Sequence, residues 1–151
     1  MKRYLMKIMM LLFLCSVFQQ KIYAKTGVGV IIGDPTAFSI KVNNFPVIGV
    51  GYSLLGKGSV YASVDYWIIN KPLSTPINWY LGVGGVGHIG SGGDKKSINN
   101  ELLLGVRVPI GLQWWATEAI EIFGEIAPTV VIIPGSDFGI NGGLGIRFYI
   151  F

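Results

Sequence analysis

The sequence predicts an all-β fold, a closed eight-stranded antiparallel up-and-down transmembrane β-barrel, preceded by a helical N-terminal signal peptide. From about residue 26 to the last residue, apolar side chains alternate with small or charged ones, as in β-strands that have different surroundings on their two faces. Turn-forming residues recur about every ten positions. One face of the alternating segments carries no charged residue, which predicts that this face meets lipid.

The first 24 residues predict a signal peptide, so that the domain boundaries are 1–24 and 25–151. A basic start is followed by an apolar run over residues 8–18 and by Ala24, a small residue suited to cleavage. The apolar run is too short to span a membrane as a helix. A lipoprotein would need a small residue before Cys15, and Leu14 is not small.

The net charge of +4 comes entirely from this predicted signal peptide. The remaining 127 residues contain eight basic and eight acidic residues, so a nucleic-acid partner is not expected. The single cysteine, Cys15, lies within the signal peptide, which leaves no disulfide and no thiolate chemistry to the barrel.

The first four strands are expected at residues 26–33, 37–43, 46–54 and 60–69. Each is bounded by Gly, Pro, Asn or Asp, the residues that favour turns. The second strand shows the alternation most clearly, because Phe38 and Ile40 share one face while Ser39 and Lys41 share the other.

The last four strands are expected at residues 78–89, 102–115, 120–133 and 138–151, and residues 70–77 are expected to be a break. Pro109 and Pro128 fall inside two of these strands. A closed barrel has no edge strand where proline is tolerated, so we expect bulges or lost ladder hydrogen bonds there.

An even number of short strands with short connections favours an up-and-down meander that closes on itself. Closure also removes exposed strand edges, which no other element is available to cover. Pairs of glycines recur as Gly-x-Gly on the less apolar face, where small residues suit the narrow interior of an eight-stranded barrel.

The alternation alone leaves open a soluble lipocalin-like barrel that binds an apolar ligand inside. Aromatic residues favour the membrane barrel, because they gather beside the even-numbered turns and the C-terminus, which share one end of a meander. An aromatic rim is typical of a membrane interface. The predicted rim consists of Tyr66, Trp67, Trp79, Tyr80, Trp114, Trp115, Phe148 and Tyr149.

Six charged residues are expected to face the lumen, three of each sign: Lys41, Asp65, Arg107, Glu121, Glu125 and Arg147. Counting across the turns predicts a network of Arg107, Glu125 and Arg147, and a separate pair of Lys41 with Asp65. Paired charges would plug the lumen, since eight strands leave room only for side chains. A small pore remains the alternative.

The C-terminal segment GGLGIRFYIF (142–151) resembles the last strand of small bacterial outer-membrane barrels of the OmpA transmembrane-domain and OmpX type. The segments 27–41, 105–114 and 127–149 are closer to uncharacterised small barrels of this kind. The resemblance implies an outer-membrane location, contact with outer-membrane lipid and recognition of the last strand by the barrel-insertion machinery. One departure is that Phe151 lies on the opposite face from the apolar residues of its strand.

No enzyme, cofactor or metal site is expected. The motif GVGGVG (82–87) fits a dinucleotide fingerprint, but no helix follows it. His88 is the only histidine and lies beside the longest loop, 90–101, where a lipid-modifying enzyme is the minor alternative. His88, Lys95 and Lys96 are therefore candidates for contact with an external ligand, and the predicted role is structural or surface interaction.

Overall fold

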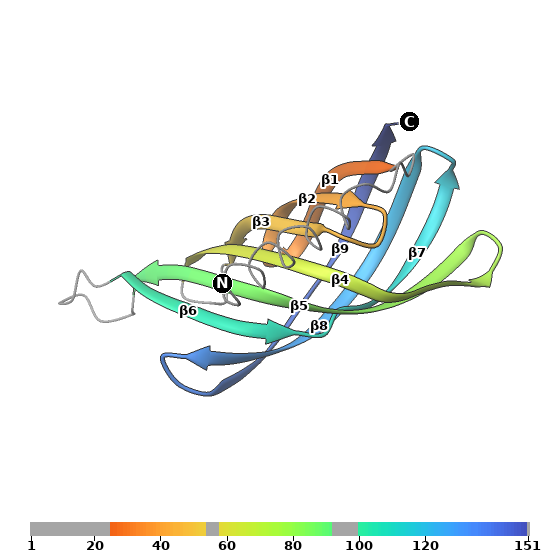
Figure 1. Cartoon of the computed structure of the whole chain (residues 1–151). Coiled ribbons are helices and arrows are strands. Elements are labelled where there is room, and N and C mark those ends of the chain that lie inside the picture. Colours follow the sequence, from red (N-terminus) through yellow and green to blue (C-terminus); the bar gives the residue numbers. More distant parts are fainter. Residues whose placement is uncertain (1–24, 54–57, 92–99, 151) are drawn as a thin grey trace, which may run out of the picture.

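The computed structural model describes residues 25–53, 58–91 and 100–150, so the predicted signal peptide lies outside the described residues. Within these ranges, no helix is long and apolar enough to cross a membrane. Nine strands form one antiparallel sheet: β1 (Thr26–Asp34), β2 (Thr36–Val42), β3 (Val47–Ser53), β4 (Ser59–Ser74), β5 (Ile77–Ser91), β6 (Asn100–Arg107), β7 (Ile110–Thr117), β8 (Ile120–Ile133) and β9 (Asp137–Ile150) (Figure 1).

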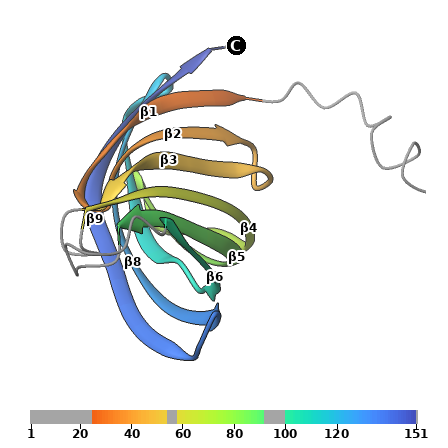
Figure 2. The ribbon, with the colours of Figure 1, turned by 90° about the vertical axis from the view of Figure 1, so that its left-hand side faces the viewer.

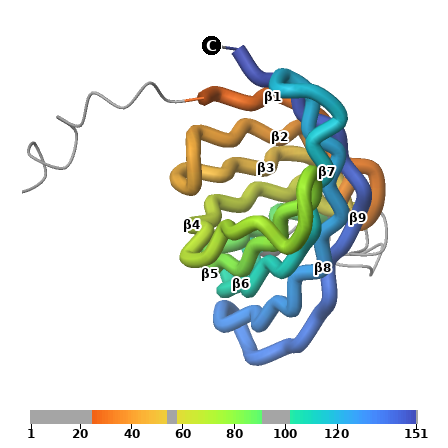
Figure 3. Tube along the Cα trace, turned by 90° about the vertical axis from the view of Figure 1, so that its right-hand side faces the viewer, coloured from red at the N-terminus to blue at the C-terminus, as the bar shows by residue number. Residues whose placement is uncertain are grey.

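The sheet closes into a ring, as the sequence predicts. Strands β1 to β5 pair in chain order, β8 pairs with β9, and β9 pairs with β1. Strands β6 and β7 lie end to end between β5 and β8 and pair with both of them. Figures 2 and 3 show the strands curving round this ring from the two sides of Figure 1. The predicted closed up-and-down barrel is confirmed.

The predicted strand 102–115 is divided into β6 and β7 at Val108-Pro109, which accounts for nine strands in a ring of eight positions. Pro109 has no N–H to donate, so the ladder is interrupted there. Its carbonyl oxygen accepts from Gly82 N–H at 2.8 Å, and Val108 N–H donates to Pro128 O at 2.9 Å. The two prolines therefore share one interruption of the ladder, in line with the expected loss of hydrogen bonds.

The predicted break at residues 70–77 is wrong, because β4 and β5 form a long hairpin across it. β4 continues to Ser74 and β5 begins at Ile77, with a register shift between Trp67 and Ile69. β3 pairs with β4 only as far as Asp65. Pro72 therefore lies where β4 has a single neighbouring strand, and an edge position tolerates proline.

The strands are staggered round the barrel. One row of paired residues runs through Val28, Ile40, Ile48, Val64, Gly85, Val106, Val130 and Phe138. Val28 itself pairs with Phe148, ten residues from Phe138 on β9. This offset gives strands tilted by about 40° from the barrel axis, so that each residue advances by roughly 2.5 Å along the axis.

The two faces of the ring differ sharply in chemistry. Large apolar side chains are exposed on the outer face of every strand, and most of the 32 exposed large apolar residues in the described ranges belong to this face. The exposed charged residues lie at strand ends and turns: Lys25, Lys71, Glu118 and Asp137. The buried charged side chains all point into the ring, which places the candidate site in the lumen.

Candidate functional site

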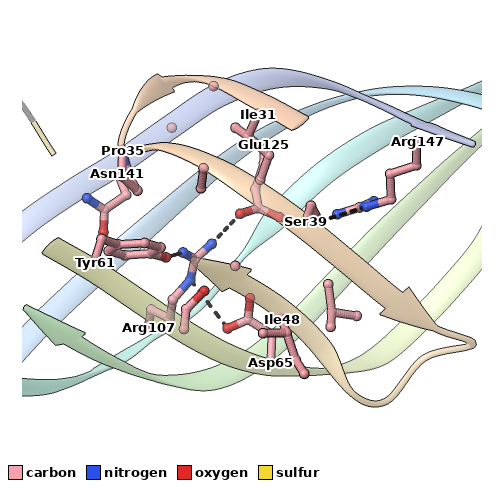
Figure 4. A pocket seen from close by; sticks show the side chains of 16 residues that line it. Ile31, Pro35, Ser39, Ile48, Tyr61, Asp65, Arg107, Glu125, Asn141 and Arg147 are labelled. Carbon is pink, nitrogen blue, oxygen red and sulfur yellow. Dashed lines mark hydrogen bonds and ion pairs between the residues drawn. The ribbon is translucent and has the colours of Figure 1, made fainter. Parts of the chain in front are cut away.

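The lumen contains two clusters of charged side chains, and the first surrounds Arg107 at the end of β6. The guanidinium of Arg107 donates from Nη1 to Tyr61 Oη on β4 and from Nη2 to Glu125 Oε1 on β8 (Figure 4). Its Nε lies 3.4 Å from Asp65 Oδ1, which is ion-pair distance. Tyr80 on β5 donates from its hydroxyl to the other oxygen of Glu125 at 2.8 Å. One cation therefore ties three strands together across the lumen.

The second cluster surrounds Glu121 on β8, whose side chain is fully buried. Arg147 Nη1 on β9 lies 2.9 Å from Glu121 Oε1, and Lys41 Nζ on β2 lies 3.5 Å from Oε2. Gln113 donates to Oε1 at 2.8 Å, and the hydroxyl of Tyr149 donates to Oε2. One buried carboxylate thus meets two cations and two neutral donors, the pattern by which buried charge is tolerated.

Aromatic rings pack against these cations and close the space between the strands. Lys41 Nζ lies 4.1 Å from the centre of the Trp67 ring, and Trp67 stacks on Tyr80 with ring centres 3.7 Å apart. Arg147 Cζ lies 3.7 Å above the Phe123 ring. The attraction between a cation and an aromatic face is strongest where water is excluded. The rings and charges here form one packed layer.

Glycines on the inner face make room for these rings. A Cβ at Gly145 would lie 2.3 Å from the Phe123 ring, and a Cβ at Gly111 would lie 2.4 Å from the Tyr80 ring. Any larger residue would therefore displace the aromatic side chain. Gly145 and Gly111 therefore occur where aromatic rings fill the adjacent part of the lumen.

Little space remains in the lumen. A cavity of about 20 Å³ lies beside Tyr61, Asp65, Arg107 and Glu125, which is room for about one water molecule. Asp65 Oδ1 and Arg107 Nε, both buried beside this cavity, have no aligned hydrogen-bond partner among the described residues. The close packing of side chains round this cavity favours a filled interior in this part of the lumen.

The ion pairs differ from those counted across the turns. Arg107 meets Glu125 as predicted, but Arg147 and Lys41 both meet Glu121, and Asp65 meets Arg107. The reason is register: the β8–β9 hairpin is centred on Pro134, with Val131 opposite Asp137, so Arg147 pairs directly with Glu121 on the neighbouring strand. All six predicted residues line the lumen, in different partnerships.

Residues 18–151 match the model of a family described as "Protein of unknown function (DUF3996)". The chain belongs to this family. Among solved structures, the fold is similar to the N-terminal β-barrel domain of Pseudomonas aeruginosa OprF, with a TM-score of 0.58 and 12% sequence identity. The similarity covers 84% of this chain and 96% of that domain, and at this identity it concerns the fold alone. Comparison with the curated proteins finds no match.

In this family member, the residues of the predicted aromatic rim divide between the two faces of the barrel. Tyr66, Trp114 and Phe148 face outward and are about half exposed, and Trp79 is half-buried beside them on the outer face. Their sequence neighbours alternate to the inside, where Trp67, Tyr80 and Tyr149 are buried and Trp115 contacts Tyr149. The aromatic residues at this end therefore supply both an outer rim and an inner packing layer.

His88 lies within β5 and points into the opposite end of the lumen. Its Nδ1 is 3.2 Å from Ser59 Oγ, and its ring meets Tyr61 edge-on with ring centres 5.2 Å apart. Lys95 and Lys96 lie outside the described residues. No group of three metal-ligating side chains occurs within the described ranges.

Sequence reasoning singled out only the charged members of the lumen as site residues. Tyr61, Gln113, Ser39 and Phe123 are all buried there and contact the charged groups. The signal was available, because each occupies the same strand parity as a predicted lumen charge. Strand parity identifies all residues of the inner face, whereas charge identifies only some of them.

Proposed function

We propose that the chain is an integral protein of the bacterial outer membrane, exported with a cleaved signal peptide at residues 1–24. Its barrel acts as a plugged scaffold that presents surface loops. The observation that carries this proposal is the charge-free outer face, where apolar side chains such as Leu144 and Phe38 are 70% and 72% exposed. A soluble protein would expose that area to water at a large cost, whereas lipid favours it.

The distribution of charge supports the same orientation. The buried cations Lys41, Arg107 and Arg147 and their carboxylate partners lie inside, at the positions that a soluble lipocalin-like barrel would fill with apolar residues. Half-exposed rings of the outer rim, including Trp114 and Phe148, would lie at the membrane interface. Lys25 and Ile150, the first and last described residues, lie at this rim, which we assign to the periplasmic side.

The packed lumen favours a structural or surface-interaction role over a pore. The proposed role requires no catalysis and no cofactor. β5 ends at Ser91 and β6 begins at Asn100 on the external side in this assignment, and we propose Lys95 and Lys96, between them in the sequence, as contacts for an unidentified surface ligand. We further propose that the C-terminal strand, β9, is recognised by the barrel-insertion machinery.

Envelope fractionation followed by electrophoresis with and without boiling tests the location and closure of the barrel. We expect the protein in the outer-membrane fraction, with a band whose mobility changes on boiling because a closed barrel resists detergent. Recovery as a soluble periplasmic protein without a mobility change would contradict the proposal and favour the lipocalin-like alternative.

Planar-bilayer recording tests whether the side chains in the lumen block the flow of ions. The unaltered protein should give no discrete conductance steps, because we expect the paired charges and stacked rings in the lumen to block a continuous water path. The matched control is a double variant, Trp67→Ala with Arg147→Ala, which removes the two largest fully buried side chains. We expect channel steps from this variant alone, and regular steps from the unaltered protein would instead establish a small pore.

A further inference from the structure

The barrel has two sides of very different height. Strands β1 to β3, here called the short wall, include two strands of only seven residues, whereas β8 and β9 of the opposite tall wall (β5 to β9) have 14 residues each. β1 ends at Asp34, which pairs with Gly142, and β9 continues five residues further to Asp137. Five residues correspond to about 12 Å along the barrel axis. In Figure 1 the β8–β9 hairpin extends beyond the short strands.

The extension of the tall wall is apolar on its outer face. Phe138 and Ile140 are 64% and 63% exposed, and Val130 and Ile132 on β8 continue the same surface. From Phe148 at the aromatic rim to Phe138, β9 advances ten residues, or about 25 Å along the axis. This is the height of the apolar band that a membrane barrel presents to lipid.

The short wall presents a much lower apolar band. β2 runs only from Val42 to Thr36, about 15 Å along the axis, before the polar turn at Asp34. On β3, the outermost large side chain before the end of the strand is Tyr52, which pairs with Thr36. Among the described residues, the band is therefore lower by roughly 10 Å at β2 and by about 5 Å at β3.

An open strand edge lies directly above the short wall. Beyond Gly142, β9 has no partner on its β1 side among the described residues. One backbone donor there, Phe138 N–H, is bonded to the carboxylate of Asp137 at 2.9 Å. Open edges do not occur in contact with membrane hydrocarbon, because their backbone groups would lose water without gaining partners.

We propose that this barrel thins the outer leaflet of its membrane beside the short wall, so that lipid there meets an apolar band about 5–10 Å lower than on the tall wall. The inference rests on the proposed membrane location. Counted through the pairs Phe148–Val28 and Val28–Ile40, the β2–β3 turn that contains Phe45 lies at about the height of Phe148. Tilting the barrel to level the outer band would therefore move one side of the aromatic rim away from the membrane interface.

The depth of spin labels in a bilayer tests this asymmetry. Tyr52→Cys and Val130→Cys, each in a Cys15→Ser background, place nitroxides within about 3 Å of the same axial height on the two walls, and Val130 has paired strands on both sides. The labelled protein is reconstituted in dioleoylphosphatidylcholine vesicles, and collisions with oxygen and with a water-soluble nickel chelate give the depth. Thr36→Cys and Val106→Cys form a second pair at similar height, in case the first pair folds poorly.

We expect the short-wall label among the headgroups and the tall-wall label about 5–10 Å inside the hydrocarbon. Equal depths would overturn the proposal, and so would a label at Val130 in water, which would put the upper part of the tall wall above the membrane. A Tyr52 label shielded from both reagents would overturn it in favour of a protein partner or a second copy. Leu144→Cys is the control for the proposed location: a label there in water refutes the membrane assignment itself.

Discussion

Replacing Glu121 with glutamine removes one negative charge from the centre of the lumen while keeping the size of the side chain. Glu121 is fully buried and is the carboxylate that both Lys41 and Arg147 contact, at 3.5 and 2.9 Å. Both cations are themselves at least 96% buried. In the Glu121→Gln variant two buried cations would therefore share no nearby anion.

The expected loss in the free energy of unfolding follows from this burial. Removing one partner of a buried ion pair costs about 3–5 kcal/mol, because the remaining charge cannot regain water. For a dependence on urea of about 2 kcal/mol per molar, the unfolding midpoint should fall by roughly 2 M. The loss exceeds that of a neutral hydrogen bond, about 1 kcal/mol, so the two explanations can be separated.

The assay is urea unfolding of the barrel in detergent micelles, followed by the mobility difference between folded and unfolded bands. Glu118→Gln, in the exposed turn before β8, is the matched control and should change the free energy of unfolding by less than about 0.5 kcal/mol. Adding Lys41→Met to Glu121→Gln should restore part of the loss, because it removes an unpaired cation. Equal midpoints for the two glutamine variants would refute the reasoning.

Two further substitutions test the packing inside and the surroundings outside. Gly145→Ala should lower the free energy of unfolding by about 1–3 kcal/mol, since its Cβ would meet the Phe123 ring. Gly139→Ala on the same strand meets nothing within 4 Å and should have little effect, and equal unfolding midpoints for the two would contradict the packing argument. Leu144→Arg should cost about 2–4 kcal/mol in lipid vesicles. That cost would be measured as a lower urea midpoint than for Glu118→Arg, and matching midpoints would argue against lipid contact at Leu144.

The alternation of side chains was enough to predict the class of fold. Segments such as 37–43 have a period of two, and a strand has only two faces, so parity assigns each residue to one of them. The same parity predicted that Arg107 and Glu121 lie on one face. The interruption at Pro109 was predictable too, because a proline lacks the N–H that a ladder requires.

The partners of the lumen charges were decided by tertiary structure. Glu121 meets Lys41, which lies 80 residues away in the sequence, through the closure of the ring and the tilt of its strands. A change of a few residues in one turn shifts every pair between the two strands that it joins, as the β8–β9 turn shows for Arg147. Sequence fixes the face of each side chain through local backbone geometry, whereas its partner depends on stagger, which is a property of the whole closed sheet.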